Sequence, residues 1–221
     1  MERHFDQELG DLKKDLLKIA ALAEEAIRRS VGALKNNDRL MAKHVIEEDA
    51  RIDALELSID EKCIDLIARH QPMARDLRFI TSAMKINAEL ERIADLAVDI
   101  SQRVFELADK PLLKPLEDIP KLTMVAQRMV RMAIDAFVKE DSVLALEVLK
   151  EDCEADALRN SIQDELVNDF MAKDGSAAPR AVPLLLIARH LERICDHATN
   201  IAEDVIYIIE AETVKHRRKV S

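Results

Sequence analysis

The chain has 221 residues, a formal net charge of −10 and a hydrophobic fraction of 48%, which suits one large or two small domains and excludes a disordered chain. The acidic balance also excludes a protein whose whole surface binds nucleic acid, because neutralising phosphates requires clustered Lys and Arg. With only three glycines and one tyrosine, the composition is typical of helices rather than sheets.

Hydrophobic periodicity and helix breakers divide the chain into six helical segments. The expected helices span residues 5–35, 38–70, 72–108, 121–139, 141–172 and, starting at Pro179 or Pro183, a last segment to 212. Asn37 or Asp38 can cap the second helix, and Pro72 suits the first turn of the third. Residues 109–120 are predicted to form a linker because they contain Pro111, Pro115 and Pro120.

No segment of the chain resembles a membrane anchor or a leader. Apolar runs stay well short of the about 18 residues that cross a bilayer, and the N-terminus lacks the apolar stretch of a signal peptide. We therefore expect a cytoplasmic protein without a transmembrane segment. Cys63, Cys153 and Cys195 show no C-x-x-C spacing, so we expect thiols in or near the core rather than disulfides or a thiolate zinc site.

The second half of the chain repeats the first. "EEDARIDALELSI" (47–59) matches "KEDCEADALRNSI" (150–162), with Asp49 and Asp53 aligned to Asp152 and Asp156. "ERIADLAVDI" (91–100) similarly matches "ERICDHATNI" (192–201). We predict an all-α fold, a tandem repeat of two antiparallel three-helix bundles in residues 1–108 and 121–221, related by a pseudo-twofold axis or a simple repeat.

The repeated stretches carry acids beside an apolar seam. Ile93, Ala97 and Ile100 follow a helical spacing that packs inward, so the acids of the same helix face outward. In an antiparallel hairpin, residues equally distant from the turn lie at one height. The acids expected to lie level are Asp49 with Asp95, Asp53 with Glu91, Asp152 with Asp196, and Asp156 with Glu192, while Asp99 and Asn200 follow one turn later.

Four carboxylates at one level repel one another, and a multivalent cation would reverse the sign of that interaction. Ligation by carboxylates alone favours Mg, Ca, Mn or ferric iron, whereas Zn more often recruits His or Cys. The alternative is a solvated acidic face neutralised by Arg51, Arg92, Arg159 or Arg193. A metal site here would be open, because the acids point away from their seam.

The stretches "ARDLRFITSAMKINAELERIADLAVDIS" (74–101) and "ARHLERICDHATNIAEDVIY" (188–207) resemble the PhoU family of phosphate-signalling regulators. The resemblance extends over essentially the whole chain. The family's E(D)-x-x-x-D motif appears four times, as Asp49/Asp53, Glu91/Asp95, Asp152/Asp156 and Glu192/Asp196. Asn200 stands where the first repeat has Asp99, which makes the second set of ligands the weaker one.

This resemblance implies two three-helix bundles with surface metal clusters, holding Fe or Zn in some members and Mg or Mn in others. It also implies a regulator without catalytic activity. Such a regulator restrains the ATPase subunit of the phosphate ABC transporter, keeps the phosphate-sensing histidine kinase inactive when phosphate is plentiful, and forms a homodimer or higher homo-oligomer. Recruitment to the inner face of the membrane would occur through these partners.

Other features have both a functional and a structural interpretation. His197 could ligate a metal, but half-buried packing is the preferred interpretation, and His190 aligns with Glu89 without a repeated histidine. Methionines at helical spacing (Met124, Met129 and Met132) favour core filling over a partner surface. The basic tail 215–219 is interpreted as a solvated terminus rather than a lipid contact.

Enzyme functions find little support in the sequence. It contains neither a G-x-x-x-x-G-K-[ST] loop nor a G-x-G-x-x-G loop, which excludes nucleotide binding through either motif. A di-iron carboxylate protein would require Glu-x-x-His pairs, which are also absent from the sequence. The alternative to a metal-binding regulator is a metal-free helical bundle that serves as a protein-interaction module.

Overall fold

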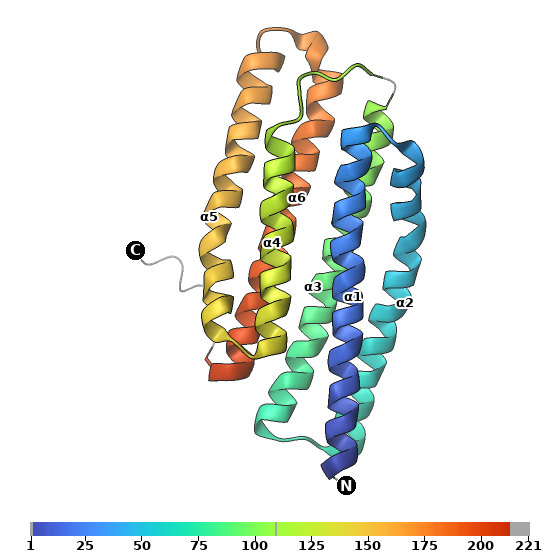
Figure 1. The fold of residues 1–221 in the computed structure, drawn as a ribbon, viewed down its shortest axis with the longest axis vertical. Coiled ribbons are helices and arrows are strands. Elements are labelled where there is room, and N and C mark those ends of the chain that lie inside the picture. The colour runs from blue at the N-terminus through green and yellow to red at the C-terminus, as the bar shows by residue number, and fades with distance from the viewer. Residues whose placement is uncertain (1, 109, 213–221) are drawn as a thin grey trace.

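The computed structural model describes residues 2–108 and 110–212, and these residues form helices joined by short connections (Figure 1). The elements are α1 (Glu2–Asn36), α2 (Arg39–His70), α3 (Ala74–Leu107), α4 (Asp118–Lys139), α5 (Ser142–Asp164), the π-helix η1 (Glu165–Met171), the 3-10 helix η2 (Gly175–Ala177) and α6 (Ala178–Glu210). Within the described ranges no strand occurs, so the all-α prediction is confirmed.

Equivalent caps start the second helix of each half. The Asp38 carboxylate accepts a hydrogen bond from the backbone N–H of Met41 at 3.0 Å, which satisfies one of the free donors at the start of α2. Asp141 does the same for Val143 and Leu144 at the start of α5. The sequence prediction that Asn37 or Asp38 caps the second helix is therefore met by Asp38.

Two helix boundaries differ from the sequence prediction because proline is tolerated in a first turn. Helix α4 begins at Asp118, inside the predicted linker 109–120, with Pro120 in its first turn, where backbone N–H groups have no helical acceptor anyway. Helix α6 begins at Ala178 and continues through Pro183. Pro183 cannot donate to the carbonyl of Pro179, and the Lys110 ammonium donates to that oxygen instead, at 3.0 Å.

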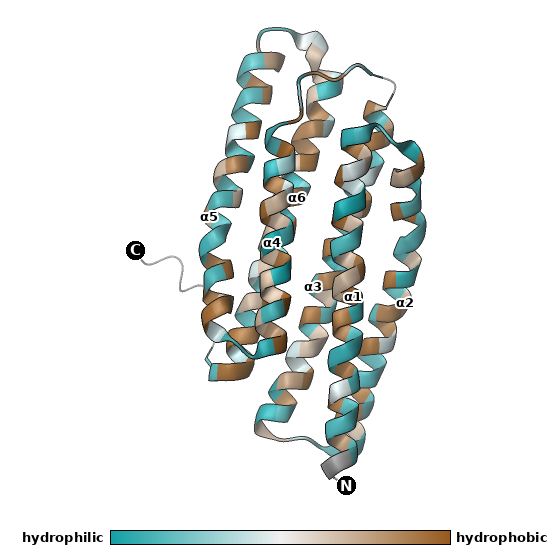
Figure 2. Ribbon diagram, in the orientation of Figure 1, coloured by the Kyte–Doolittle hydropathy of each residue, from teal (hydrophilic) through white to brown (hydrophobic). Residues whose placement is uncertain are grey.

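The two three-helix units lie side by side and run in opposite directions. Figure 1 shows α1 rising and the adjacent α4 descending, and α3 and α6 also contact each other in an antiparallel pair. This arrangement corresponds to the predicted pseudo-twofold axis rather than to a simple repeat. Apolar and polar residues interchange along every helix (Figure 2), as in amphipathic helices that share one core. None of the helices in the described ranges is both long and apolar enough to cross a membrane.

Candidate metal centre

The first acidic cluster combines one pair of acids from α2 with another from α3. Ile52 and Ile93 are buried on the core side of these helices, which leaves Asp49 and Asp53 of α2 beside Asp95 of α3. Removal of water by the surrounding helices, together with the charges of Asp53 and Asp95, raises the pKa of Asp49 to about 6. The carboxylates therefore lie close enough to oppose one another's ionisation.

The pair of acids that α3 contributes to this cluster, Glu91 and Asp95, shows the same effect. The loss of water around Glu91 and the charges of Asp95 and Glu56 raise the pKa of Glu91. The pKa of Asp95 is raised by the same desolvation and by the charges of Asp53 and Asp99. Structure and sequence agree that α2 and α3 present their acids to each other along one groove.

The second cluster repeats this arrangement on α5 and α6. The side chain of Asp196 is exposed, but neighbouring protein atoms displace enough water, and Glu192 and Asp152 add enough negative charge, to raise its pKa to about 6. Asp156 also contributes to this shift. The thiol of Cys195 lies buried beneath these acids, and burial raises its pKa.

As the side chains stand, the acids do not form a ready-made ion cage. Among residues 2–108 and 110–212, no group of three or more His, Cys, Asp or Glu side chains is positioned to share one metal ion. The donor type suits a hard cation, since the clusters consist of carboxylates, and desolvation together with the neighbouring acids raises the pKa values of Asp49 and Asp196. Ion binding would require exposed carboxylates to change rotamer.

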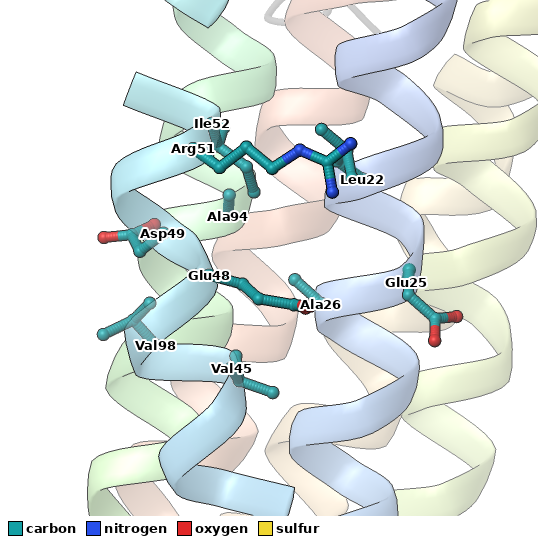
Figure 3. Close-up of a pocket in the computed structure, with 10 residues that line it drawn as sticks. All are labelled: Leu22, Glu25, Ala26, Val45, Glu48, Asp49, Arg51, Ile52, Ala94 and Val98. Atoms are coloured by element: carbon teal, nitrogen blue, oxygen red, sulfur yellow. The ribbon is translucent and has the colours of Figure 1, made fainter. Parts of the chain in front are cut away.

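The arginines proposed as neutralising partners differ between the repeats. Arg159 lies 3.8 Å from Glu192, and Arg92 lowers the pKa of Asp95 without overcoming the acids around it. Figure 3 shows Glu48 and Arg51 reaching toward α1, whereas the carboxylate of Asp49 points away from α1. The pocket in that view, about 20 Å³, has room for no more than a water molecule.

Asp99 and Asn200, the last residues of the two predicted ligand rows, face the boundary between the repeats. The Asn200 amide donates to the Glu89 carboxylate at 3.0 Å, and the pseudo-twofold equivalent of this contact places His190 3.7 Å from Asp99. Nδ1 of His197 lies 2.5 Å from the same Glu89 oxygen, so His197 is a half-buried packing residue in this structure. The role of Asn200 as a ligand stays a prediction, and its amide is already engaged.

The sequence analysis missed Glu89, which accepts contacts from both His197 and Asn200 of α6. Burial acts to raise the pKa of Glu89, but hydrogen bonds from His197 and Asn200 lower it below its usual value. The only available signal in the sequence was that an acidic residue, Glu89, aligns with a basic one, His190, in the other repeat. The contacts of Glu89 with His197 and Asn200 could not be predicted, because these residues lie far apart along the chain.

The cysteines and methionines match their interpretation only in part. Cys63 and Cys195 are buried, and burial raises the pKa of Cys63 to about 12, but Cys153 is exposed on α5, on the side away from the core. The expectation that all three thiols lie in or near the core was therefore wrong for Cys153. Met129 is buried and Met132 partly so, whereas Met124 is 66% exposed. The basic tail 215–219 lies outside the described residues.

Comparison with known proteins agrees with this architecture. The family model described as "PhoU domain" matches residues 16–104 and again 119–205. A PhoU homolog of Aquifex aeolicus, named a phosphate-specific transport system accessory protein, is 39% identical over 96% of this chain and 95% of its own length. The corresponding Pseudomonas aeruginosa homolog is 36% identical over 98% of this chain and 89% of its own length.

Solved structures share the same fold. The crystal structure of PhoU from Pseudomonas aeruginosa matches with a TM-score of 0.90 and 37% identity, covering 94% of this chain and 100% of that chain. That of the phosphate transport system regulatory protein PhoU from Streptococcus pneumoniae matches with a TM-score of 0.89 and 28% identity, covering 96% and 99%. With the family model repeated over both three-helix units, the chain belongs to the PhoU family.

Proposed function

We propose that this chain is a cytoplasmic, non-enzymatic regulator of phosphate uptake and of phosphate-starvation signalling. It restrains the phosphate ABC transporter through the ATPase subunit and keeps the phosphate-sensing histidine kinase inactive when phosphate is plentiful. Full-length similarity to accessory proteins of the phosphate-specific transport system supports the regulatory role. A homodimer or higher homo-oligomer belongs to the same proposal.

The proposed regulator binds metal ions at its two acidic clusters. The observation that supports this part is the pKa of about 6 at both Asp49 and Asp196, one in each repeat. Desolvation, together with the charges of neighbouring carboxylates, raises each pKa, and a bound cation would favour the ionised carboxylates. The carboxylate donors suit Mg, Mn or Fe, with Zn as the remaining candidate. The ligands would come from Asp49, Asp53, Glu91, Asp95 and Asp99 in one repeat, and from Asp152, Asp156, Glu192, Asp196 and Asn200 in the other.

Elemental analysis of the untagged protein tests the metal sites. We expect bound metal in the wild type and at least tenfold less in Asp95→Ala/Asp196→Ala. Asp11→Ala/Asp169→Ala is the charge-matched control, because these acids lie outside both clusters and each pairs with a lysine three or four residues further along the chain. Equal and near-zero metal in all three proteins would leave the metal-free helical bundle as the better description.

Phosphate uptake into proteoliposomes that contain the purified transporter tests the regulatory role separately. Wild-type protein added on the ATPase side is expected to slow uptake at high phosphate, and a parallel assay should show reduced autophosphorylation of the kinase. The control variant Asp11→Ala/Asp169→Ala should act like the wild type. An uptake rate and a kinase activity that are both indifferent to the wild-type protein would rule out the proposal, whatever the metal content.

A further inference from the structure

A cleft of about 720 Å³ lies in the second repeat between α6 and the helix formed by α5 and η1. Its volume is in the range of sites that enclose a sizeable ligand or a short peptide segment. Arg159, Arg189 and Arg193 line it together with the acids Glu192 and Asp196 and with apolar side chains that include Val167 and Leu185. Three guanidinium groups against two carboxylates leave the cleft with a net positive formal charge beside an apolar surface.

A substitution between the repeats removes one link between the two helices that form this cleft. In the first repeat, the amide of buried Asn87 donates to the backbone oxygen of Glu56 at 2.9 Å and to the carboxylate of Asp60 at 3.1 Å, which ties α3 to α2. The second repeat has Ala188 at the position of Asn87, which cannot make these hydrogen bonds, and the ion pair of Arg159 with Glu192 at 3.8 Å links α5 to α6 there. Within the described residues, the wider π-helical turns of η1 follow α5 and have no counterpart after α2. They contribute Val167 to the cleft.

The groove also becomes more positively charged in the second repeat. Arg159 and Arg189 occupy the positions that Glu56 and Ala88 hold in the first repeat. Glu56 adds to the negative charge around Glu91, whereas its counterpart Arg159 lies 3.8 Å from Glu192. Acids therefore line both units, but in the second unit three arginines lie beside Glu192 and Asp196 in the cleft.

Two of the three guanidinium groups are available to a ligand. In the described part of the chain, neither Arg189 nor Arg193 makes a hydrogen bond or an ion pair, and both side chains are exposed. An exposed ion pair contributes about 0 to 1 kcal/mol, so these charges alone would hold a free oxyanion weakly. A useful affinity requires a ligand that also covers the apolar surface around Leu185 and Val167.

We infer that the α5–α6 cleft of the second repeat docks an acidic, apolar-bearing segment of a partner protein. Carboxylates of that segment meet Arg189 and Arg193, and an apolar side chain covers Leu185 and Val167. This inference rests on the proposed function, because it names the surface through which the regulator reaches the phosphate transporter. The first repeat offers a weaker site, since Asn87 bridges its groove and Glu56 stands in place of Arg159.

The test measures the affinity of the full chain for the purified phosphate transporter held in nanodiscs. Arg189→Ala/Arg193→Ala removes the two available charges, and Lys18→Ala/Lys150→Ala removes two exposed charges outside the cleft. We expect at least about tenfold weaker binding for the arginine variant and less than about twofold change for the lysine control. Ala188→Asn, which places the first-repeat residue in the cleft without altering charge, should also weaken binding. If that buried substitution unfolds the protein, the arginine variant alone carries the test.

Four outcomes are distinguishable. Selective loss in the arginine variant supports the inference. Equal binding by the arginine and lysine variants overturns the docking surface and leaves the proposed function intact, whereas no binding by the wild type removes both. Inorganic phosphate that competes better than chloride at equal ionic strength would show that a free oxyanion occupies the cleft, and would overturn the assignment to a protein segment.

Discussion

Nδ1 of His197 in α6 lies 2.5 Å from Oε2 of Glu89 in α3, and this contact joins the two repeats across their pseudo-twofold interface. The Asn200 amide donates to the same carboxylate oxygen at 3.0 Å. Both Glu89 and His197 are largely shielded from water, with side-chain exposures of 20% and 13%. A charged hydrogen-bond acceptor in such surroundings holds its partners more strongly than a surface pair does.

Replacing Glu89 by Ala should therefore destabilise the protein by about 2 kcal/mol, because His197 and Asn200 lose their shared acceptor at a packed interface. Urea denaturation at pH 7 with a chelator present measures this loss. Asp99→Ala is the matched control, since Asp99 faces His190 at the pseudo-twofold equivalent position but at 3.7 Å, beyond hydrogen-bond distance. If both variants lost the same free energy of unfolding, the contacts of Glu89 with His197 and Asn200 would not contribute more to stability than the longer contact of Asp99.

The pH dependence of stability should expose the crowding of the acids. Asp49 and Asp196 have pKa values of about 6 in the folded protein, whereas an unfolded aspartate titrates near 4. Between about pH 4 and pH 6 the folded state keeps protons that the unfolded chain has released, so both groups make the metal-free protein less stable as pH rises through this window.

We therefore expect Asp49→Asn/Asp196→Asn to be more stable than the wild type at pH 7 by about 1 to 2 kcal/mol, a value reduced for the partial exposure of both side chains, and to differ little at pH 4. Urea denaturation of both proteins at the two pH values, with a chelator present, gives the difference directly. If that difference stayed constant with pH, the two carboxyls would not carry raised pKa values.

Bound metal ions should stabilise the folded protein, in contrast to the destabilising effect of the ionised acids in the metal-free state. Binding to the folded state alone stabilises it by about 2.7 kcal/mol when the free ion stands at 100 times its Kd. Thermal unfolding of the chelator-treated wild type should shift upward with added Mn²⁺ or Mg²⁺, and Asp95→Ala/Asp196→Ala should show no shift. Asp11→Ala/Asp169→Ala should respond like the wild type. A shift of the same size in the cluster variant would place the ion elsewhere on the molecule.

The two helix caps offer a test of the repeat itself. Asp38→Ala and Asp141→Ala each remove the side-chain acceptor at the start of α2 or α5, and each should cost about 1 kcal/mol. The α1–α2 and α4–α5 turns lie at opposite ends of the molecule (Figure 1), so the double variant should lose about the sum. Chemical denaturation measures all three, and strong non-additivity would contradict independent caps.

The helices were predictable because their signals are local. Seams such as Ile93, Ala97 and Ile100 recur at helical spacing, and Asp38 and Asp141 provide the side-chain oxygens that helix starts require. The starts of α4 and α6 were less predictable, since Pro120 and Pro183 resemble helix breakers in sequence. Pro120 costs little in a first turn, and the carbonyl left free by Pro183 finds Lys110, 69 residues away.

The acidic rows could be found by counting along each hairpin, because the heights of residues in an antiparallel pair follow from their distances to the turn. The raised pKa values of Asp49 and Asp196 could not be predicted in this way, because the desolvation of a carboxylate depends on every neighbouring helix.

The sequence by itself determined the six helices, their duplication and the placement of Asp49 and Asp196 beside apolar seams, since each of these follows from spacing along one chain segment. Tertiary structure alone decided that α3 and α6 run antiparallel, that Glu89 receives His197 and Asn200, and that Asn87 bridges α3 to α2 whereas Ala188 lines a cleft. These features depend on side chains that meet across more than one helix, and no local pattern encodes such a meeting.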